Sequence, residues 1–273
     1  MSDKLNQARL QKGQWWMETY KKYYDADKEL STYFSNESGF DEDSIMAPLK
    51  HWIRVLCSGA VKGDTLILYG GAYNLSLLFP ACGYFKDFII IDFLESRVKS
   101  AKKWINKESG AFDWSRVAEM VCELEGDSEK WSEKEDTLRC TIKEVIVCEP
   151  SDTHPVAPKI PVQADCLIAP FSLEVLSIDQ DAFREAIKSL SPLIRVGGCL
   201  ILIILLECTF GMLGNFKFPF LSLREEFLRQ VLIDSCYDIK EFHVTPRINE
   251  SSYSSIDFSS IAFIVAQKVN EVQ

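Results

Sequence analysis

Short apolar runs alternate with amphipathic stretches along most of the chain, which is the pattern of βαβ units. The apolar runs predict strands over residues 64–69, 88–92, 144–148, 164–169, 199–206, 237–244 and 260–267. Helical periodicity predicts helices over residues 71–82, 95–106, 112–140 (with one break near Gly126), 179–190 and 223–235. The last two strands are joined by a loop without a helical signal, so we expect them to pair antiparallel. The alternation predicts an α/β fold with a mostly parallel sheet.

Two further helices, over residues 5–30 and 45–57, are predicted before the first strand. Trp16, Tyr20, Tyr23 and Tyr24 fall on one face of the first of them, where aromatic residues usually pack in a core. No linker-like stretch divides the chain. We therefore predict a single domain over residues 1–273, with a helical cap (1–60) on a Rossmann-like core (61–273).

Composition narrows the classes of partner. The 273 residues carry 30 Lys and Arg against 40 Asp and Glu, a net charge of −10. This balance argues against nucleic-acid binding and against docking on anionic membranes. The longest apolar run, residues 199–206, is far shorter than the ~20 residues that a membrane-spanning helix needs. Nine scattered cysteines without a CxxC pair indicate buried thiols in a reducing compartment, so we expect a cytoplasmic protein.

The ends of the first two predicted strands carry the candidate ligand-binding residues. The first strand runs into Gly70, Gly71 and Ala72, and the second ends at Asp92. A glycine turn lets the backbone approach a ligand, and an acid at the end of the next strand can accept hydrogen bonds from ribose hydroxyls. The stretch lacks GxGxxG. A tight turn and a strand-end acid with purely structural roles remain the alternative at this stage.

Several motifs point to a known family. They are Tyr23-Tyr24, Val61-Lys62-Gly63-Asp64, Gly110-Ala111-Phe112-Asp113-Trp114-Ser115, Cys122-Glu123-Leu124-Glu125-Gly126 and Ser252-Tyr253-Ser254. In these the chain resembles, from about Tyr20 to its end, the small-amine N-methyltransferases that act on nicotinamide, indolethylamine and phenylethanolamine. The resemblance implies the class I S-adenosylmethionine-dependent methyltransferase fold, a Rossmann-like, seven-stranded, mostly parallel sheet with an N-terminal helical cap. It also implies transfer of a methyl group from S-adenosylmethionine to an amine or pyridine nitrogen.

The resemblance assigns cofactor-binding positions, and many of them depart from the family pattern. The positions are Tyr24, Gly70, Gly71, Ala72, Asp92, Phe93, Glu149, Pro150 and Pro170. The family's acid before the glycine turn is Leu68, its second glycine is Ala72 and its tyrosine after the turn is Ser76. Pro150 and Pro170 have no backbone N–H to donate. The ribose acid is kept as Asp92, whereas the asparagine that follows it is Arg97.

The substrate side has changed as well. The family-equivalent pocket positions are Tyr20, Ile204, Glu207, Thr209 and Phe210. Ile204 replaces the aspartate that holds the substrate amide in the nicotinamide enzyme, and Glu207 is the alternative acid if the alignment shifts. The three histidines, His51, His154 and His243, have no metal-ligand spacing, so no metal site is predicted and no catalytic residue is assigned.

Two functions follow from these substitutions. Each lost hydrogen bond costs about 1–3 kcal/mol, and several together would weaken cofactor binding more than ~1000-fold. The first hypothesis is a methyltransferase-fold protein with a degraded S-adenosylmethionine site, inactive or impaired, with a structural, storage or apolar-ligand-binding role. The alternative is an active S-adenosylmethionine-dependent N-methyltransferase of a small apolar amine. The cofactor is S-adenosylmethionine or none, the partner a small molecule or none, and self-association is left open.

Overall fold

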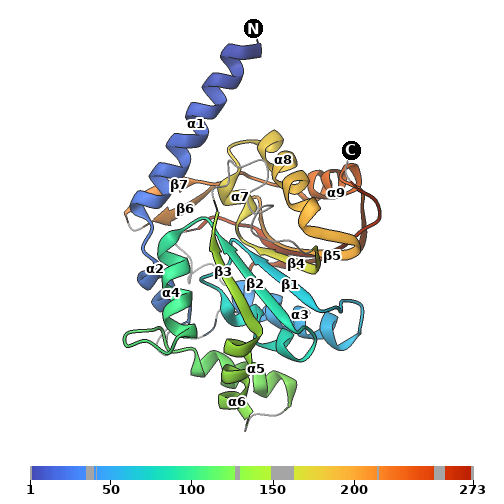
Figure 1. Ribbon diagram of the computed structural model, residues 1–273. Helices are drawn as coiled ribbons and strands as arrows, with labels where there is room; N and C mark the ends of the chain where they lie inside the picture. The colour runs from blue at the N-terminus through green and yellow to red at the C-terminus, as the bar shows by residue number, and fades with distance from the viewer. Residues whose placement is uncertain are drawn as a thin grey trace.

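The fold is built on one seven-stranded sheet (Figure 1). The computed structural model describes residues 2–34, 40, 42–126, 130–148, 163–213, 215–248 and 256–271, with side chains from residue 12 onward. The strands are β1 (Thr65–Tyr69), β2 (Asp87–Asp92), β3 (Ile142–Val147), β4 (Ala164–Pro170), β5 (Ile194–Leu206), β8 (Tyr237–Pro246) and β9 (Ser260–Lys268). Their order is β3-β2-β1-β4-β5-β9-β8. All seven predicted strands are present.

Strand direction also agrees with the sequence. The pairs β2–β3, β1–β2, β1–β4 and β4–β5 are parallel, whereas β9 runs antiparallel to both β5 and β8. The predicted antiparallel pairing of the last two strands is confirmed. The sheet is mostly parallel, so the carboxyl ends of β1, β2 and β4 meet at one edge, where ligands bind in open α/β sheets.

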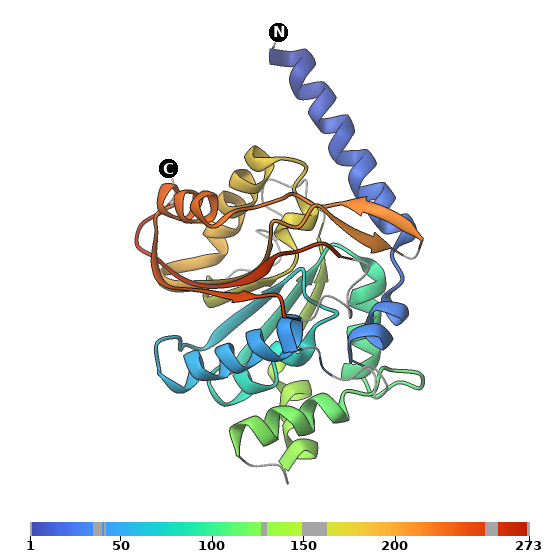
Figure 2. The same cartoon turned by 180° about the vertical axis from the view of Figure 1, so that it is seen from behind.

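Helices cover both faces of the sheet (Figures 1 and 2). One face packs against α3 (Ala47–Cys57), α4 (Glu95–Ile105), α5 (Ser115–Glu125) and α6 (Trp131–Thr141). The other packs against α7 (Leu173–Leu176), α8 (Gln180–Leu190) and α9 (Glu225–Asp234). Successive strand residues alternate between the two cores: Leu66 and Leu68 belong to the first, Ile67 and Tyr69 to the second. Burial on both faces explains why the strands read as continuous apolar runs.

The cap departs from the sequence prediction at one point. The single helix predicted over residues 5–30 is two helices, α1 (Ser2–Tyr23) and α2 (Ala26–Phe34). The break follows from Asp25, whose Oδ1 accepts the backbone N–H of Lys28 at 3.0 Å and so caps the start of α2. Figure 1 shows the first part of α1 projecting beyond the rest of the fold. After α2, the π-helical turn η1 (Glu42–Met46) leads into α3.

The helix predicted over residues 71–82 is wrong. The segment forms two 3-10 turns, η2 (Leu75–Leu77) and η3 (Pro80–Gly83). Leu75, Leu77, Leu78 and Phe79 are all buried, so the segment has no polar face, and Pro80 cannot donate a helical hydrogen bond. The break predicted near Gly126 is confirmed, because Gly126 ends α5 in the left-handed conformation (φ +84°).

A short hairpin was not predicted from the sequence. Its strands are β6 (Phe210–Leu213) and β7 (Phe216–Pro219), and they lie beside α1 (Figure 1). The ring centroids of Trp16 and Phe218 are 4.9 Å apart, and those of Tyr23 and Phe216 are 4.5 Å apart and parallel. The hairpin therefore supports the cap over the sheet edge. No helix within the described part of the chain has the length and apolarity to cross a membrane.

Candidate functional site

The glycine turn and Asp92 lie side by side at the carboxyl ends of β1 and β2. Tyr69 pairs with Ile91 in the last rung of the ladder, and the N–H of Gly70 donates to the carbonyl of Ile91 at 2.7 Å. Gly70 has a left-handed backbone (φ +68°), a conformation that favours glycine. The two candidate features are therefore brought together, as the strand order requires.

Side chains of this chain fill the space beside both glycines. A Cβ atom on Gly70 would lie 2.5 Å from the Cβ of Ser172. A Cβ atom on Gly71 would lie 2.9 Å from both the Cδ1 of Leu68 and the Cγ of Pro170. Internal packing thus requires both glycines. Two of the residues in contact, Leu68 and Pro170, are positions at which the resemblance leads us to expect a departure from the family pattern.

Asp92 is fully buried, and each of its carboxylate oxygens is bonded to the chain's own backbone. Oδ2 accepts the N–H of Ala72 at 3.0 Å, and Oδ1 accepts the N–H of Leu94 at 2.9 Å. Burial raises the pKa of Asp92, while Arg97 and these backbone N–H groups oppose the rise. The carboxylate holds the turn after β1 against the turn after β2.

Arg97, in the first turn of α4, places its guanidinium in the middle of the site. Nε donates to the hydroxyl of Tyr24 at 2.6 Å, and Nη1 to the carbonyl of Gly70 at 3.4 Å. Nη2 contacts both carboxylate oxygens of Glu29 at 3.2 Å and the hydroxyl of Tyr20 at 3.3 Å. Nη1 is also 3.9 Å from Oδ2 of Asp92. Only 3% of Arg97 is exposed. Its buried positive charge lies beside two carboxylates, those of Glu29 and Asp92.

Four aromatic rings surround the guanidinium of Arg97. Its central carbon lies 4.3 Å from the ring centroids of both Tyr24 and Tyr73, 5.5 Å from that of Phe93 and 6.0 Å from that of Tyr20. These distances are in the range of cation–π attraction, which strengthens when the groups are removed from water. We name the group of Tyr20, Tyr24, Glu29, Tyr73, Asp92 and Phe93 the Arg97 cage.

The charged groups of the cage shift one another's pKa values. Burial raises the pKa of Glu29 to about 7, although the Arg97 guanidinium opposes that rise. Burial disfavours the charge on Arg97, but Glu29, Tyr20 and Asp92 outweigh it and raise the pKa of Arg97 above its ordinary value. Arg97 is thus held as a cation.

Sequence reasoning recorded Arg97 only as the loss of an asparagine. Glu29 and Tyr73 were not identified at all. One signal was available for Arg97: it shares the buried face of α4 with Val98, Ala101 and Trp104, at helical spacing. Glu29 and Tyr73 carried no comparable signal.

A surface groove of about 760 Å³ adjoins the cage on its outer side. Tyr24 lines it together with residues of the α1–α2 junction and of α4, among them Lys22, Asp25, Lys99 and Lys103. Tyr24 is the one predicted site residue among the described residues that line this groove. Tyr24 thus contacts Arg97 and also borders the groove.

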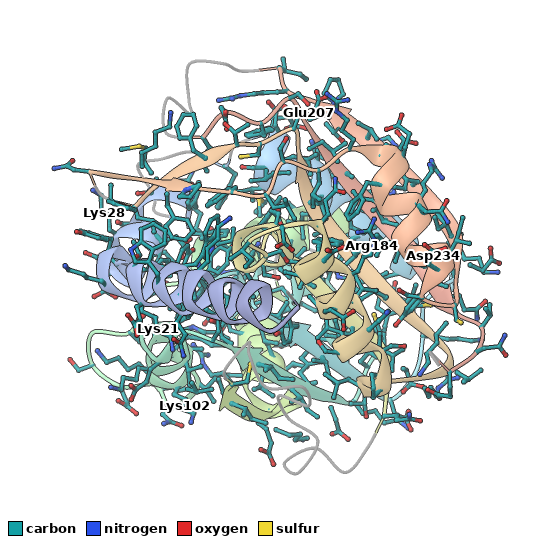
Figure 3. All side chains as sticks on the ribbon, turned by 90° about the horizontal axis from the view of Figure 1, so that it is seen from above. Lys21, Lys28, Lys102, Arg184, Glu207 and Asp234 are labelled. Atoms are coloured by element: carbon teal, nitrogen blue, oxygen red, sulfur yellow. The ribbon has the colours of Figure 1, made fainter. Side chains whose placement is uncertain are left out.

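The predicted substrate-pocket residues lie in different parts of the fold. Tyr20, on the cap helix α1, packs against Phe93 and Phe218 at centroid distances of 5.8 and 5.1 Å. Ile204 is fully buried in the other core, in the layer of α8 and α9. The carboxylate of Glu207 is half-exposed, 3.3 Å from the Nε atom of Arg224, at the rim of the molecule (Figure 3). Tyr20 and Ile204 therefore belong to separate buried clusters, and Glu207 lies outside both.

Thr209 and Phe210 are tied to Asp257, which sequence reasoning missed. Their backbone N–H groups donate to its Oδ1 at 2.7 and 2.9 Å, and the hydroxyl of Thr209 donates to Oδ2. Burial opposes the charge of this carboxyl, but the hydrogen bonds from Thr209 and Phe210 lower the pKa of Asp257. Of the other predicted positions, Glu149 and Pro150 lie outside the described residues.

The comparisons with known proteins agree on one family. The model of the family described as "NNMT/PNMT/TEMT family" matches residues 12–269. Rabbit (Oryctolagus cuniculus) indolethylamine N-methyltransferase is 32% identical over 91% of this chain and 95% of its own length. Pig (Sus scrofa) nicotinamide N-methyltransferase is 35% identical over 78% and 80%, and rat (Rattus norvegicus) phenylethanolamine N-methyltransferase 34% over 82% and 79%.

Solved structures support the fold. Magnesium protoporphyrin IX methyltransferase from Synechocystis PCC 6803, solved with bound S-adenosylmethionine, matches with a TM-score of 0.54 at 12% identity, over 93% of this chain and 97% of that one. An S-adenosylmethionine-dependent methyltransferase from Leishmania major matches with a TM-score of 0.56 at 8% identity, over 92% and 83%. The sheet thus has the class I methyltransferase fold that the resemblance implied. By its sequence over residues 12–269, the chain belongs to the NNMT/PNMT/TEMT family of methyltransferases.

Proposed function

We propose that this family member keeps its cofactor cleft closed with its own side chains and has a non-catalytic role. The observation that carries the proposal is Asp92, which is fully buried, with each carboxylate oxygen bonded to backbone N–H. Its oxygens have no exposed surface, so a ribose could reach this acid only if the residues around it moved. The acid therefore serves the fold of the free protein.

The residues present do not fit S-adenosylmethionine in this arrangement. Ser172, Leu68 and Pro170 contact the glycine turn closely, and Arg97 contacts both Gly70 and Asp92. A bound cofactor would need to displace a buried cation from two carboxylates, and breaking such a pair costs about 3–5 kcal/mol. That cost alone would weaken binding at least ~100-fold.

The alternative is an active N-methyltransferase of a small apolar amine. It is favoured by Gly70 and Asp92, which lie at the ends of neighbouring parallel strands as in a nucleoside site. It requires Arg97 to leave the cage when the cofactor enters.

Under either function, we infer a cytoplasmic protein. Five of its cysteines are buried as small apolar side chains, and this use of cysteine suits a reducing compartment.

Titration calorimetry with S-adenosylmethionine and S-adenosylhomocysteine tests the proposal. We expect no saturable heat up to about 1 mM ligand and no rise in Tm at that concentration, since a ligand that binds the native state raises Tm. A catalytically active nicotinamide N-methyltransferase, titrated in the same buffer, is the positive control. A dissociation constant in the micromolar range for this chain would contradict the proposal and favour the alternative.

A further inference from the structure

Arg97 joins parts of the chain that are far apart in sequence. Its backbone belongs to α4, on the core, while its guanidinium contacts Tyr20 of α1, Glu29 of α2 and Tyr24 between those helices. The same guanidinium contacts Gly70 and lies beside Asp92, at the ends of β1 and β2. One side chain thus connects the cap, α4 and the cofactor edge of the sheet.

The cage has the chemistry of a site for an organic cation. It offers two carboxylates and four aromatic rings, and these face the guanidinium together with the carbonyl of Gly70. Aromatic walls with a few acceptors are typical of sites that bind ammonium or guanidinium ligands. The carboxylate of Glu29 adds charge-assisted hydrogen bonds, and that of Asp92 adds a negative charge 3.9 Å from Nη1.

We propose that the Arg97 cage is a cation-binding site whose resident ligand is the chain's own Arg97, and that this contact latches the cap to the core. The inference rests on the proposed function, because it names what occupies the same site. It assigns to the cage a specificity for planar guanidinium cations, and to Arg97 the role of positioning α1 and α2.

Hydrogen exchange of the variant Arg97→Ala tests the latch. We expect backbone amides of residues 16–34 to exchange at least about tenfold faster than in the wild type, while the strands β1, β4 and β5 change less. Guanidinium chloride at about 10 mM, far below denaturing concentrations, should enter the emptied cage and slow exchange in residues 16–34 back toward the wild-type rate.

Arg139→Ala is the matched control. Arg139 also stacks on an aromatic ring, 4.2 Å from Trp104, and pairs with Glu135 and Asp136, but it lies on α6. We expect this variant to leave exchange in residues 16–34 unchanged, with and without guanidinium. Equal responses of the two variants to guanidinium would overturn the proposal, as would failure of guanidinium to slow exchange in Arg97→Ala.

A second variant covers the case in which Arg97→Ala does not fold. Arg97→Lys keeps the charge but loses the planar fork that reaches Tyr24, Gly70 and Glu29 together. It should exchange faster than the wild type in residues 16–34, and wild-type exchange there would overturn the latch. Cofactor titration is a separate readout: micromolar binding by the wild type would contradict the proposed function, whereas unchanged cap exchange contradicts only the latch.

Discussion

Replacing Asp92 with asparagine should lower the free energy of unfolding by about 3–5 kcal/mol in the absence of any ligand. The carboxylate accepts one backbone N–H on each oxygen and lies beside the buried Arg97. An asparagine amide would turn its NH₂ group toward one of these N–H donors and remove the charge that Arg97 needs. Urea unfolding followed by circular dichroism, with and without the substitution, measures the loss.

Asp87→Asn is the matched control, at the other end of the same strand. The carboxylate of Asp87 is about half-exposed and 3.8 Å from the Nζ atom of Lys143. Exposed ion pairs contribute about 0–1 kcal/mol, so we expect a correspondingly small change in the free energy of unfolding. If Asp92→Asn lowers the free energy of unfolding no more than Asp87→Asn does, the carboxylate of Asp92 does not stabilise the fold.

Replacing Gly70 with alanine should destabilise the fold by about 2–4 kcal/mol. The left-handed backbone costs a non-glycine residue about 1 kcal/mol, and the new Cβ would lie 2.5 Å from the Cβ of Ser172, which adds about 1–3 kcal/mol of overpacking. The same urea titration measures it. Gly110→Ala separates the two costs, because Gly110 is also left-handed (φ +76°) but has no atom within 4 Å of such a Cβ. We expect about 1 kcal/mol for that control.

A double substitution tests whether contact with Ser172 causes the loss of stability in Gly70→Ala. Ser172→Gly removes the atoms that the new Cβ would meet, so Gly70→Ala should cost about 1–2 kcal/mol less in that background. Additive costs of the two substitutions would show that Ser172 does not restrict the turn. A cost of Gly70→Ala equal to that of Gly110→Ala would show the same.

The sheet could be predicted because its signal is local. The inner strands are buried on both faces and are continuous apolar runs, whereas the edge strand β8 is only partly buried and mixes apolar with polar residues. The hairpin of β6 and β7 was missed because each strand has only four residues and they include Gly211 and Pro219. The helix predicted over residues 71–82 was wrong because Leu75, Leu77 and Leu78 are all buried, and the segment lacks the exposed face of an amphipathic helix.

The candidate site, too, could be predicted from the sequence only in part. Strand order alone brings Gly70 and Asp92 together, because parallel strands end at one edge of the sheet. What fills that edge depends on contacts between distant residues: Arg97 and Glu29 are 68 positions apart, and Gly70 and Ser172 meet through packing of two separate loops. In the sequence, Arg97 is therefore interpreted only as a missing ligand contact, while in the fold it supplies an internal contact.

The close packing around the glycine turn also constrains how this sequence can evolve. Ser172, Leu68 and Pro170 each contact the turn, so each now contributes to the stability of the native state. An acid in place of Leu68, which is fully buried, would be an unpaired charge in the core. The residues around the turn are therefore coupled by epistasis, and a polar replacement at one of them would need a second change beside it.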